Sequence, residues 1–308
     1  MNIMSLINAL PGAVAQGLIW GIMAIGVYVT YRILDVADLT VDGTMCVGGA
    51  VCIMMMLGGS NVWVAIGAAV IAGAGAGLVT GIFHTVMGIP PILSGILTQL
   101  ALWSVNLKIM GKANQAINVD KYDLLVSLRY IKGVALTKNT IFIVAVAIVI
   151  VIAILYWFFG TELGCAIRAT GCNGNMARAQ GINTNFNKVL GLMVSNALVA
   201  LSSALLAQYQ GFADINMGRG AIVIGLAAVI IGEAIFGRIF RNFGLKLLGI
   251  ALGSVIYYFV LQVVIWLGVD TDLLKMFSAI VVAFFLAIPY WKSTYFSKPV
   301  KKGGNADA

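Results

Sequence analysis

The sequence predicts an all-α integral membrane protein with about nine transmembrane helices. Of its 308 residues, 61% are hydrophobic and only 10% are charged, whereas about a quarter of the residues in a soluble domain carry a charge. Several apolar runs reach the roughly 20 residues that a helix needs to cross a bilayer. A helix satisfies its backbone hydrogen bonds within itself, and the runs do not alternate in the short segments of an outer-membrane barrel. We therefore expect a helix bundle.

Nine predominantly apolar runs give the expected helices in chain order. They lie at about 7–31, 41–58, 62–85, 91–110, 139–160, 188–208, 219–237, 245–268 and 273–291. In the third run, Gly73, Gly77 and Gly81 recur every four residues. Small residues at that spacing allow helices to approach closely in lipid, so we interpret these glycines as a packing surface. The whole chain, 1–308, is then a single transmembrane domain.

Lysine and arginine residues orient these helices, because they favour the cytoplasmic side of short loops. Basic residues occur in the segment at 161–188, in the segment at 238–246 and in the tail at 292–308. Nine helices with a cytoplasmic C-terminus place all three segments inside and the N-terminus outside. The same parity places the loop at 111–138 outside, although this loop is also basic. We attribute the net charge of +8 to this topology and expect no nucleic-acid partner.

Two stretches of the chain are similar to each other. The stretch ADLTVDGTMCVGGAV at 37–51 is echoed by ADINMGRGAIVIGLA at 213–227. An odd number of expected helices separates the two copies, so they would run in opposite directions across the bilayer. Inverted repeats of this kind mark transporters, with the solute near the interface between the repeats. The half-repeats would cover 7–138 and 188–291, and chance similarity of Gly- and Ala-rich segments is the alternative.

Polar groups at membrane depth are energetically expensive and are therefore candidates for function. The candidates for a substrate pathway are Asp38, Thr40, Asp42, Asn106, Asp214, Asn216 and Arg219. All of them except Asn106 lie at or just before the start of the second or seventh expected helix. If these segments are broken helices, their ends can face the carboxylate or ammonium group of an amino acid. The alternatives are helix capping at the membrane interface and, for Asn106, a hydrogen bond to a neighbouring helix.

A polar segment at 161–183, TELGCAIRATGCNGNMARAQGIN, separates two long apolar runs. Asn173 suits a helix N-cap, and Gly181 suits the position just after a helix end. Ala, Met and Arg between them favour a helix of about two turns that lies outside the membrane. Ala and Gly let another protein approach closely, as a docking surface requires. A plain connector between helices has about two to eight residues, and this segment is longer.

This segment resembles the cytoplasmic coupling loop of ABC-transporter permeases of the branched-chain amino-acid type. The family pattern, roughly Thr-x-x-Gly-x-x-x-Arg-Ala followed by Asn, Ala and Gly-Ile-Asn, is matched by Thr161, Gly164, Arg168, Ala169, Asn173, Ala177, Gly181, Ile182 and Asn183. DLTVDGT at 38–44 and GIPPILSGILTQLALWSVNLKIMGKAN at 88–114 are similar to the tryptophan/tyrosine-type uptake permeases of that family. The resemblance covers most of residues 15–290.

The resemblance implies a type II-like ABC importer permease with an inverted repeat and broken helices. Such a subunit translocates a small solute, here an aromatic or branched-chain amino acid, across the bacterial inner membrane. A separate ATPase subunit docks on the coupling loop at 161–187, an extracellular or periplasmic binding (lipo)protein delivers the solute, and a second copy completes the pathway. The residues expected at the ATPase contact are Gly164, Arg168, Ala169, Asn173, Met176, Ala177, Gly181 and Ile182. Ala177 in particular is expected to face the ATPase.

The chain itself is not expected to be an enzyme or to hold a cofactor or a metal ion. Its sequence has no GxxxxGK[ST] phosphate loop, so it cannot be the ATPase, and its single histidine argues against a metal-dependent membrane enzyme. The main rival is an ion- or proton-coupled secondary carrier that uses membrane carboxylates such as Asp42 and Glu233. Because Glu233 lies about five residues before Arg238, we favour a salt bridge at a helix end for Glu233.

Overall fold

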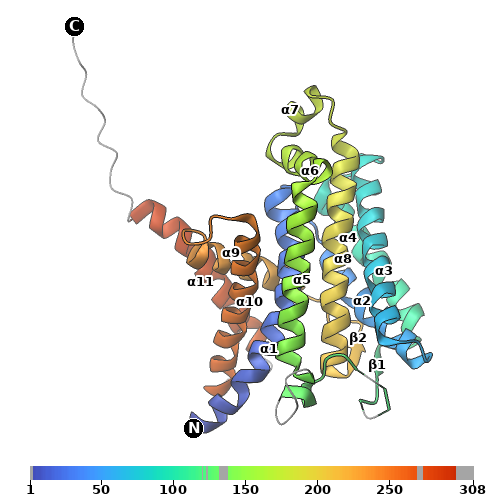
Figure 1. Ribbon diagram of the computed structural model, residues 1–308, viewed down its shortest axis with the longest axis vertical. Helices are drawn as coiled ribbons and strands as arrows, with labels where there is room; N and C mark the ends of the chain where they lie inside the picture. The colour runs from blue at the N-terminus through green and yellow to red at the C-terminus, as the bar shows by residue number, and fades with distance from the viewer. Residues whose placement is uncertain (1–2, 120, 123, 132–137, 269–272, 296–308) are drawn as a thin grey trace.

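Helices form almost all of the computed structural model, which describes residues 3–295 apart from 120, 123, 132–137 and 269–272 (Figure 1). The long helices are α1 (Ile3–Tyr28), α2 (Thr40–Leu57), α3 (Val62–Thr85), α4 (Pro91–Met110), α5 (Thr140–Gly160), α8 (Thr184–Gln210), α9 (Ala221–Phe236), α10 (Phe243–Trp266) and α11 (Leu274–Tyr295). The short helices α6 (Glu162–Cys172) and α7 (Gly174–Ala179) lie at one end of the bundle. A short 3-10 helix, η2 (Leu128–Ile131), lies in the loop before α5.

The helices confirm the expected all-helical membrane protein. Among the described residues, seven helices are long and apolar enough to cross a membrane, and α9 and part of α11 are shorter apolar helices. The ranges expected for the third and fourth helices coincide with α3 and α4. α8 begins at Thr184 rather than at 188, because the Asn183 side chain accepts a hydrogen bond from the N–H of Phe186 and caps the helix. Most of the tail expected at 292–308 falls outside the described residues.

α8 lies at the centre of the bundle and packs against α1 through hydroxyl groups. The Ser195 hydroxyl donates to the backbone carbonyl of Gly26, and the Ser202 hydroxyl donates to that of Ile19, each at 2.8 Å. The contacts pair increasing residue numbers in α8 with decreasing numbers in α1, so the two helices are antiparallel. Hydrogen bonds between helices help to hold a bundle together in lipid, where apolar burial supplies little driving force.

The glycines of α3 form the close packing surface that the sequence predicts, and α8 is the helix they approach. A methyl group on Gly77 would overlap with the backbone of Leu192, and one on Gly81 would lie only 3.0 Å from the Cα atom of Val189. A methyl group on Gly75 would meet nothing within 4 Å. Only the α8-facing glycines are therefore required for the contact.

α2 and α9 both begin inside the bundle after a segment that is not helical. Residues 34–39 join α2 to η1 (Val29–Ile33), the π-helical turn that ends α1, and residues 211–220 join α9 to α8. α2 runs parallel to α8, because its successive hydrogen bonds meet successive α8 residues. α8 is antiparallel to α1, α1 is antiparallel to α10, and α10 is antiparallel to α9. Three successive reversals of direction make α9 antiparallel to α8. α2 and α9 therefore point in opposite directions.

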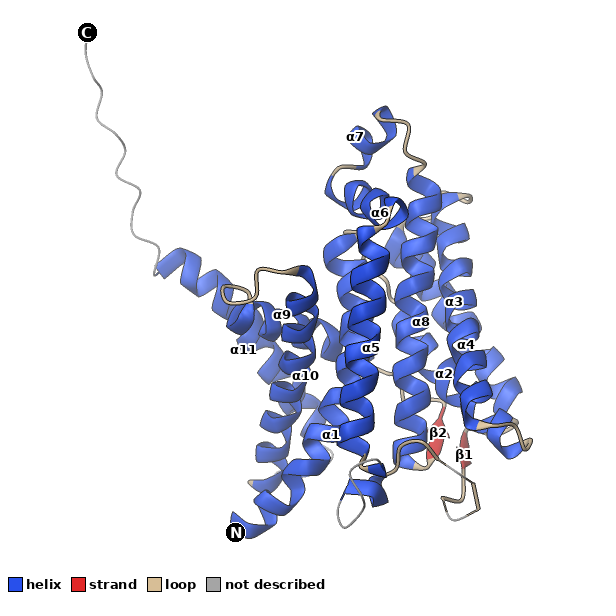
Figure 2. Ribbon diagram, in the orientation of Figure 1, coloured by secondary structure: helices blue, strands red, loops and turns tan. Residues whose placement is uncertain are grey.

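A two-stranded sheet departs from the purely helical expectation. β1 (Asn114–Ala116) and β2 (Phe212–Asp214) pair in antiparallel fashion, with Gln115 opposite Ala213. Figure 2 shows both strands at the end of the bundle opposite to α6 and α7. The sheet ties the loop after α4 to the segment before α9.

A substitution in α3 tests the packing surface. We expect Gly77→Ala to destabilise the protein by about 1–3 kcal/mol, because the added methyl group overpacks the α3–α8 contact. Gly75→Ala is the matched control, since it adds the same methyl group where nothing is within 4 Å, and alanine favours a helix by about 1 kcal/mol over glycine. The thermal midpoints of the purified variants in detergent measure both effects. Equal midpoints for the two variants would contradict the packing surface.

Candidate functional site

The first turns of α2 and α9 are joined by one carboxylate. Asp42 lies in the first turn of α2, and its two oxygens accept hydrogen bonds from the N–H groups of Gly220 and Ile222, each at 3.0 Å. The first N–H groups of a helix have no partner within the helix, and they carry a partial positive charge that favours an anion. Asp42 therefore joins the first turn of α2 to the N-terminus of α9. Gly218 lies against it, where a methyl group would overlap with the backbone carbonyl of Asp42.

A second carboxylate, Asp38, is held in a buried polar network. Asp38 is 2% exposed, and one of its oxygens accepts from the N–H of Thr40 at 2.9 Å, which caps α2. Its other oxygen accepts from the Asn196 amide in α8 at 2.7 Å, and the amide oxygen of Asn196 accepts from the Thr44 hydroxyl at 2.7 Å. All of these partners are neutral. The network therefore fixes the start of α2 against the middle of α8.

The network continues into α3 and α4 through threonine hydroxyls. The Thr40 and Thr80 hydroxyl oxygens are 2.7 Å apart, and the Thr80 hydroxyl is 2.9 Å from that of Thr98. These three threonines are at most 1% exposed. Thr40 therefore faces neighbouring helices in this structure, and four helices meet at its level.

Asp214 makes the same kind of turn as Asp38. One Asp214 oxygen accepts from the N–H of Asn216 at 2.7 Å, two residues further along, as Asp38 accepts from Thr40. Its second oxygen accepts from the Asn114 amide at 3.3 Å, across the two-stranded sheet. Asp214 is thus at the sheet end of the bundle, and Asn216 beside it is exposed.

A cavity of about 140 Å³ brings together three of the predicted pathway residues, Asp42, Asn106 and Arg219. Gln99 and Trp103 of α4 also line this cavity, which we call the α4 cavity. Asn106 is 1% exposed, and its amide donates to the carbonyl of Gly43 at 3.3 Å. Its side-chain oxygen has no hydrogen-bond partner among the described residues. The cavity therefore brings together an amide, a carboxylate, a guanidinium group and an aromatic ring.

The remaining predicted pathway residues do not line the α4 cavity. Asp38 and Thr40 belong to the buried network, and Asp214 and Asn216 lie near the sheet. Trp103 was missed by the sequence analysis, because a tryptophan in an apolar run gives no signal that separates a cavity wall from a lipid contact.

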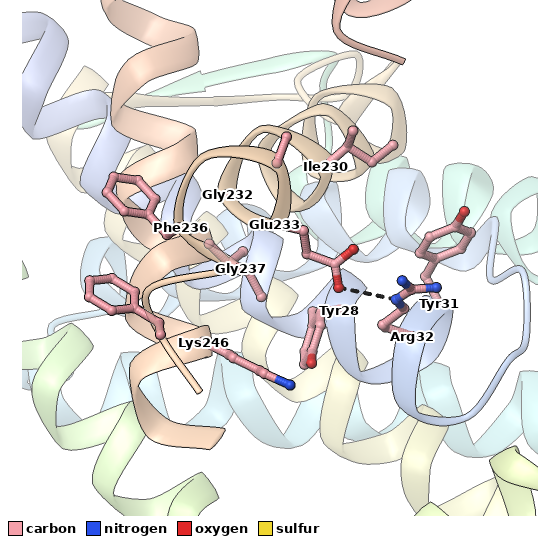
Figure 3. A pocket seen from close by; sticks show the side chains of 12 residues that line it. Tyr28, Tyr31, Arg32, Ile230, Gly232, Glu233, Phe236, Gly237 and Lys246 are labelled. Carbon is pink, nitrogen blue, oxygen red and sulfur yellow. Dashed lines mark hydrogen bonds and ion pairs between the residues drawn. The ribbon is translucent and has the colours of Figure 1, made fainter. Parts of the chain in front are cut away.

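A larger cavity, of about 540 Å³, opens between η1, α9 and the start of α10. Figure 3 shows Glu233 and Arg32 facing each other there, joined by an ion pair of 3.0 Å between Glu233 Oε1 and Arg32 Nε. The sequence analysis favoured a salt bridge at a helix end for Glu233, and the salt bridge is present. The cation that it considered, Arg238, is wrong, because the partner is Arg32. The π-helical turn at the end of α1 brings Arg32 beside α9, a tertiary contact that sequence distance does not reveal.

The polar segment between α5 and α8 forms two helices, not one. Thr161 caps α6, and Asn173 caps α7 by accepting from the N–H of Met176 at 3.0 Å. Gly181 follows α7 with a positive φ of 81°. The N–H of Ile182 bonds to the carbonyl of Ala177 at 3.1 Å, and that of Gly181 bonds to Arg178, which is a Schellman ending. The predicted roles of Asn173 and Gly181 as helix ends are confirmed.

The two helices present a different face from the one expected. Ala177 is only 1% exposed, whereas Met176 is 57% exposed. The expectation that Ala177 faces a partner is wrong, because its methyl group packs inside the chain. Arg168 is exposed with its guanidinium 5.8 Å from the Phe243 ring centre, and Ala169 is partly buried.

The glycines of α6 are packing residues. A methyl group on Gly164 would overlap with the end of α5, and one on Gly171 would overlap with the carbonyl of Ile33 in η1. α6 therefore rests directly on the backbone of the turn that leads to residues 34–39. Gly171 was missed by the sequence analysis.

No group of three or more His, Cys, Asp or Glu side chains that could hold a metal ion occurs within the part of the chain that the structure describes. The four cysteines are free thiols, with Cys46 and Cys52 buried and Cys165 and Cys172 exposed.

Known permeases are similar to this chain over most of its length. The family described as branched-chain amino acid transport system, permease component, matches residues 10–287. The tyrosine transport system permease protein of Clostridioides difficile (strain R20291) is 38% identical over 281 residues, which cover 91% of both chains. The ribose import permease protein RbsC of Escherichia coli (strain K12) is 27% identical over 282 residues, 86% of both chains. A solved structure, PsaBC from Streptococcus pneumoniae in complex with Fab, aligns with 85% of this chain and 95% of its own at 19% identity and a TM-score of 0.41.

Removing the charge of Asp42 tests its bridging role. We expect Asp42→Asn to destabilise the protein by about 1–3 kcal/mol, because a charge-assisted pair of hydrogen bonds to helix N–H groups is weakened. Asp35→Asn is the matched control, since Asp35 is exposed and has a φ of 54° that asparagine also adopts. Thermal midpoints in detergent should fall for the first variant only. Equal midpoints would show that the Asp42 charge does not hold α9.

Proposed function

This chain belongs to the family of permease components of branched-chain amino acid transport systems, and we propose that its solute is an aromatic amino acid such as tyrosine. As a member of that family, it is the multi-pass membrane subunit of an ABC importer that moves a small solute. Permeases of this family are not catalytic, carry no cofactor and work with ATPase and binding-protein partners. The ion- or proton-coupled carrier is therefore no longer a viable alternative.

The choice of solute rests on one observation, the 38% identity with a tyrosine transport permease over 91% of both chains. The α4 cavity supports it chemically. The guanidinium of Arg219 suits an amino-acid carboxylate, while the carboxylate of Asp42 suits an ammonium group. The Trp103 ring offers a surface for an aromatic side chain or for the ammonium group. In this proposal Asp38, Thr40, Asp214 and Asn216 shape the pathway by holding its broken helices.

Nine membrane crossings and an inverted repeat are part of the proposal, in a type II arrangement. The opposite directions of α2 and α9 support it, as does the shared turn at Asp38 and Asp214. When the two similar stretches are aligned, Asp42 and Gly218 are equivalent, and these two residues are in contact. Equivalent residues meet in this way when they lie near a two-fold axis between repeats. The half-repeats are 7–138 and 188–291.

We place the α6–α7 end of the bundle in the cytoplasm and the two-stranded sheet outside a bacterial cell membrane. This orientation follows the basic residues of 161–188 and 238–246 and gives a cytoplasmic C-terminus. The ATPase then docks on the coupling loop, where Arg168 and Met176 are exposed. Asn173 and Gly181, which are also exposed, define the two ends of α7. Gly164 and Ala177 are buried and Ala169 and Ile182 are partly buried, so these four residues support the loop from within. A binding protein delivers solute at the sheet end, and a second copy of the chain completes the pathway.

Contacts within the chain give a route from the docking surface to the solute. α7 follows α6, and Gly171 of α6 rests on the Ile33 carbonyl. The next residues, 34–39, lead to Asp38 and the start of α2. Displacing α6 would therefore move the turn that sets the position of Asp42 and the α4 cavity. In an alternating-access cycle, ATP-driven approach of the two ATPases would supply that displacement.

Uptake of labelled tyrosine tests the proposed solute. We expect cells that produce this permease with its ATPase and binding protein to accumulate tyrosine, and to stop when the ATPase is omitted. Arg219→Gln should reduce uptake about tenfold or more, because losing a charged hydrogen bond costs about 1.5–3 kcal/mol. Lys112→Gln, at another exposed cation, is the control and should leave uptake unchanged. If leucine competes better than phenylalanine, the solute is a branched-chain amino acid instead.

A substitution in α7 tests the docking surface. We expect Met176→Glu to lose the ATPase during purification and to abolish uptake, because an unpaired charge buried in an interface costs several kcal/mol. Met176→Leu is the control, since it keeps a similar apolar volume. Both variants should insert and keep their thermal midpoints, because Met176 is 57% exposed. Full ATPase binding and uptake by Met176→Glu would place docking elsewhere.

A further inference from the structure

Four cations from separate parts of the chain line a third cavity. This cavity has a volume of about 250 Å³, and its cations are Arg32 of η1, Arg168 of α6, Arg241 of the loop before α10, and Lys246 of α10. We call it the basic cavity. No carboxylate is among the described residues that line it. Positive charge in a cytoplasmic loop is ordinary, but convergence of four cations from three separate segments (η1, α6 and 238–246) on one cavity requires an explanation.

The charges in the basic cavity are only partly balanced by the chain. Arg32 is paired with Glu233 at 3.0 Å, and the Arg168 guanidinium lies 5.8 Å from the centre of the Phe243 ring. Neither Arg241 nor Lys246 forms an ion pair with a described residue. Like charges brought together near a low-dielectric membrane repel one another. An anion in the cavity would relieve that repulsion.

The basic cavity lies at the ends of membrane-spanning helices. Arg32 is in the last turn of the candidate span Met4–Ile33, and Lys246 is in the first turn of the span Phe243–Trp266. Cations at this level meet lipid headgroups, and basic pockets between helices bind anionic headgroups. Tyr156 of α5 and Leu245 of α10, which are 52% and 45% exposed near the start of α10, offer an apolar surface for an acyl chain.

We propose that the basic cavity binds the phosphate group of an anionic phospholipid. The guanidinium groups match phosphate oxygens in two-point contacts, and the Lys246 ammonium adds a further donor. The lipid is favoured over a soluble phosphate because the cavity lies at headgroup level beside exposed apolar side chains. Its occupant would contact α1, α6 and α10 together, and so would join the segment that carries Arg168 to two membrane helices. This inference does not depend on which solute is transported.

Lipid-dependent thermal stability tests the proposal with the full-length permease purified in detergent. We expect phosphatidylglycerol to raise the thermal midpoint by a few degrees, and phosphatidylcholine with the same acyl chains to do so much less. The double variant Arg241→Gln/Lys246→Gln should lose most of the shift. Arg238→Gln is the matched control, because Arg238 is exposed in the same loop but does not line the cavity. Native mass spectrometry of co-purified phosphatidylglycerol gives a second readout that does not depend on melting.

Several outcomes would overturn the proposal. An equal shift with inorganic phosphate would replace the lipid by a soluble anion. An equal shift with phosphatidylcholine, whose headgroup has a phosphate but no net charge, would show that the cavity does not select an anionic lipid. An unchanged phosphatidylglycerol shift and an unchanged lipid count in the double variant would exclude the basic cavity as the site. If the double variant keeps its lipid response but loses the ATPase, the cations serve a protein partner. Should the double variant fail to fold, Arg241→Lys, which keeps the charge, must retain the lipid response that the single Arg241→Gln variant weakens.

Discussion

The carboxylate of Asp42 resolves the main difficulty of this architecture, which is that two helices begin inside the bundle with their N-termini together. Each N-terminus presents unpaired N–H groups and a partial positive charge, and bringing two of them together adds electrostatic repulsion. Asp42 accepts from the N–H groups of Gly220 and Ile222 while belonging to the first turn of α2. Gly218 leaves room for this approach. The two non-helical segments and the opposite directions of α2 and α9 depend on that bridge.

The polar side chains of the interior divide into two groups by whether the chain itself satisfies them. Both oxygens of Asp38 accept hydrogen bonds from Thr40 and Asn196, so Asp38 has a structural role in this conformation. The Asn106 oxygen has no partner among the described residues, and Arg219 is exposed. The sequence analysis weighed solute contact against capping for Asp38 and Arg219, and against a hydrogen bond to a neighbouring helix for Asn106. The structure supports capping for Asp38 and a hydrogen bond to the neighbouring α2 for the Asn106 amide, whereas Arg219 is exposed.

Local features of the sequence predicted more of the structure than tertiary ones could. The apolar runs, the glycine spacing of α3, and the helix ends at Asn173 and Gly181 were predictable, because each follows from a propensity within a few residues. α6 was not predicted, since its glycines disfavour an isolated helix, and packing of Gly164 and Gly171 on neighbouring backbone accounts for it. The inward orientation of Ala177 likewise arises from tertiary packing. The α4 cavity joins residues from three separate segments, and no local pattern connects them.

The position of α8 in the chain has a consequence for biosynthesis. α8 supplies hydrogen-bond partners for α1 and α2, yet it is synthesised after the long helices α1 to α5, and Asp38 and Asn196 are 158 residues apart in sequence. Until α8 emerges from the ribosome, a nascent chain carries the Asp38 carboxylate without its amide partner. The insertion machinery must therefore retain α1 and α2, or tolerate their polar surfaces, for the time needed to translate those residues. Truncated products that end before α8 would expose the same polar surfaces to membrane quality-control proteases.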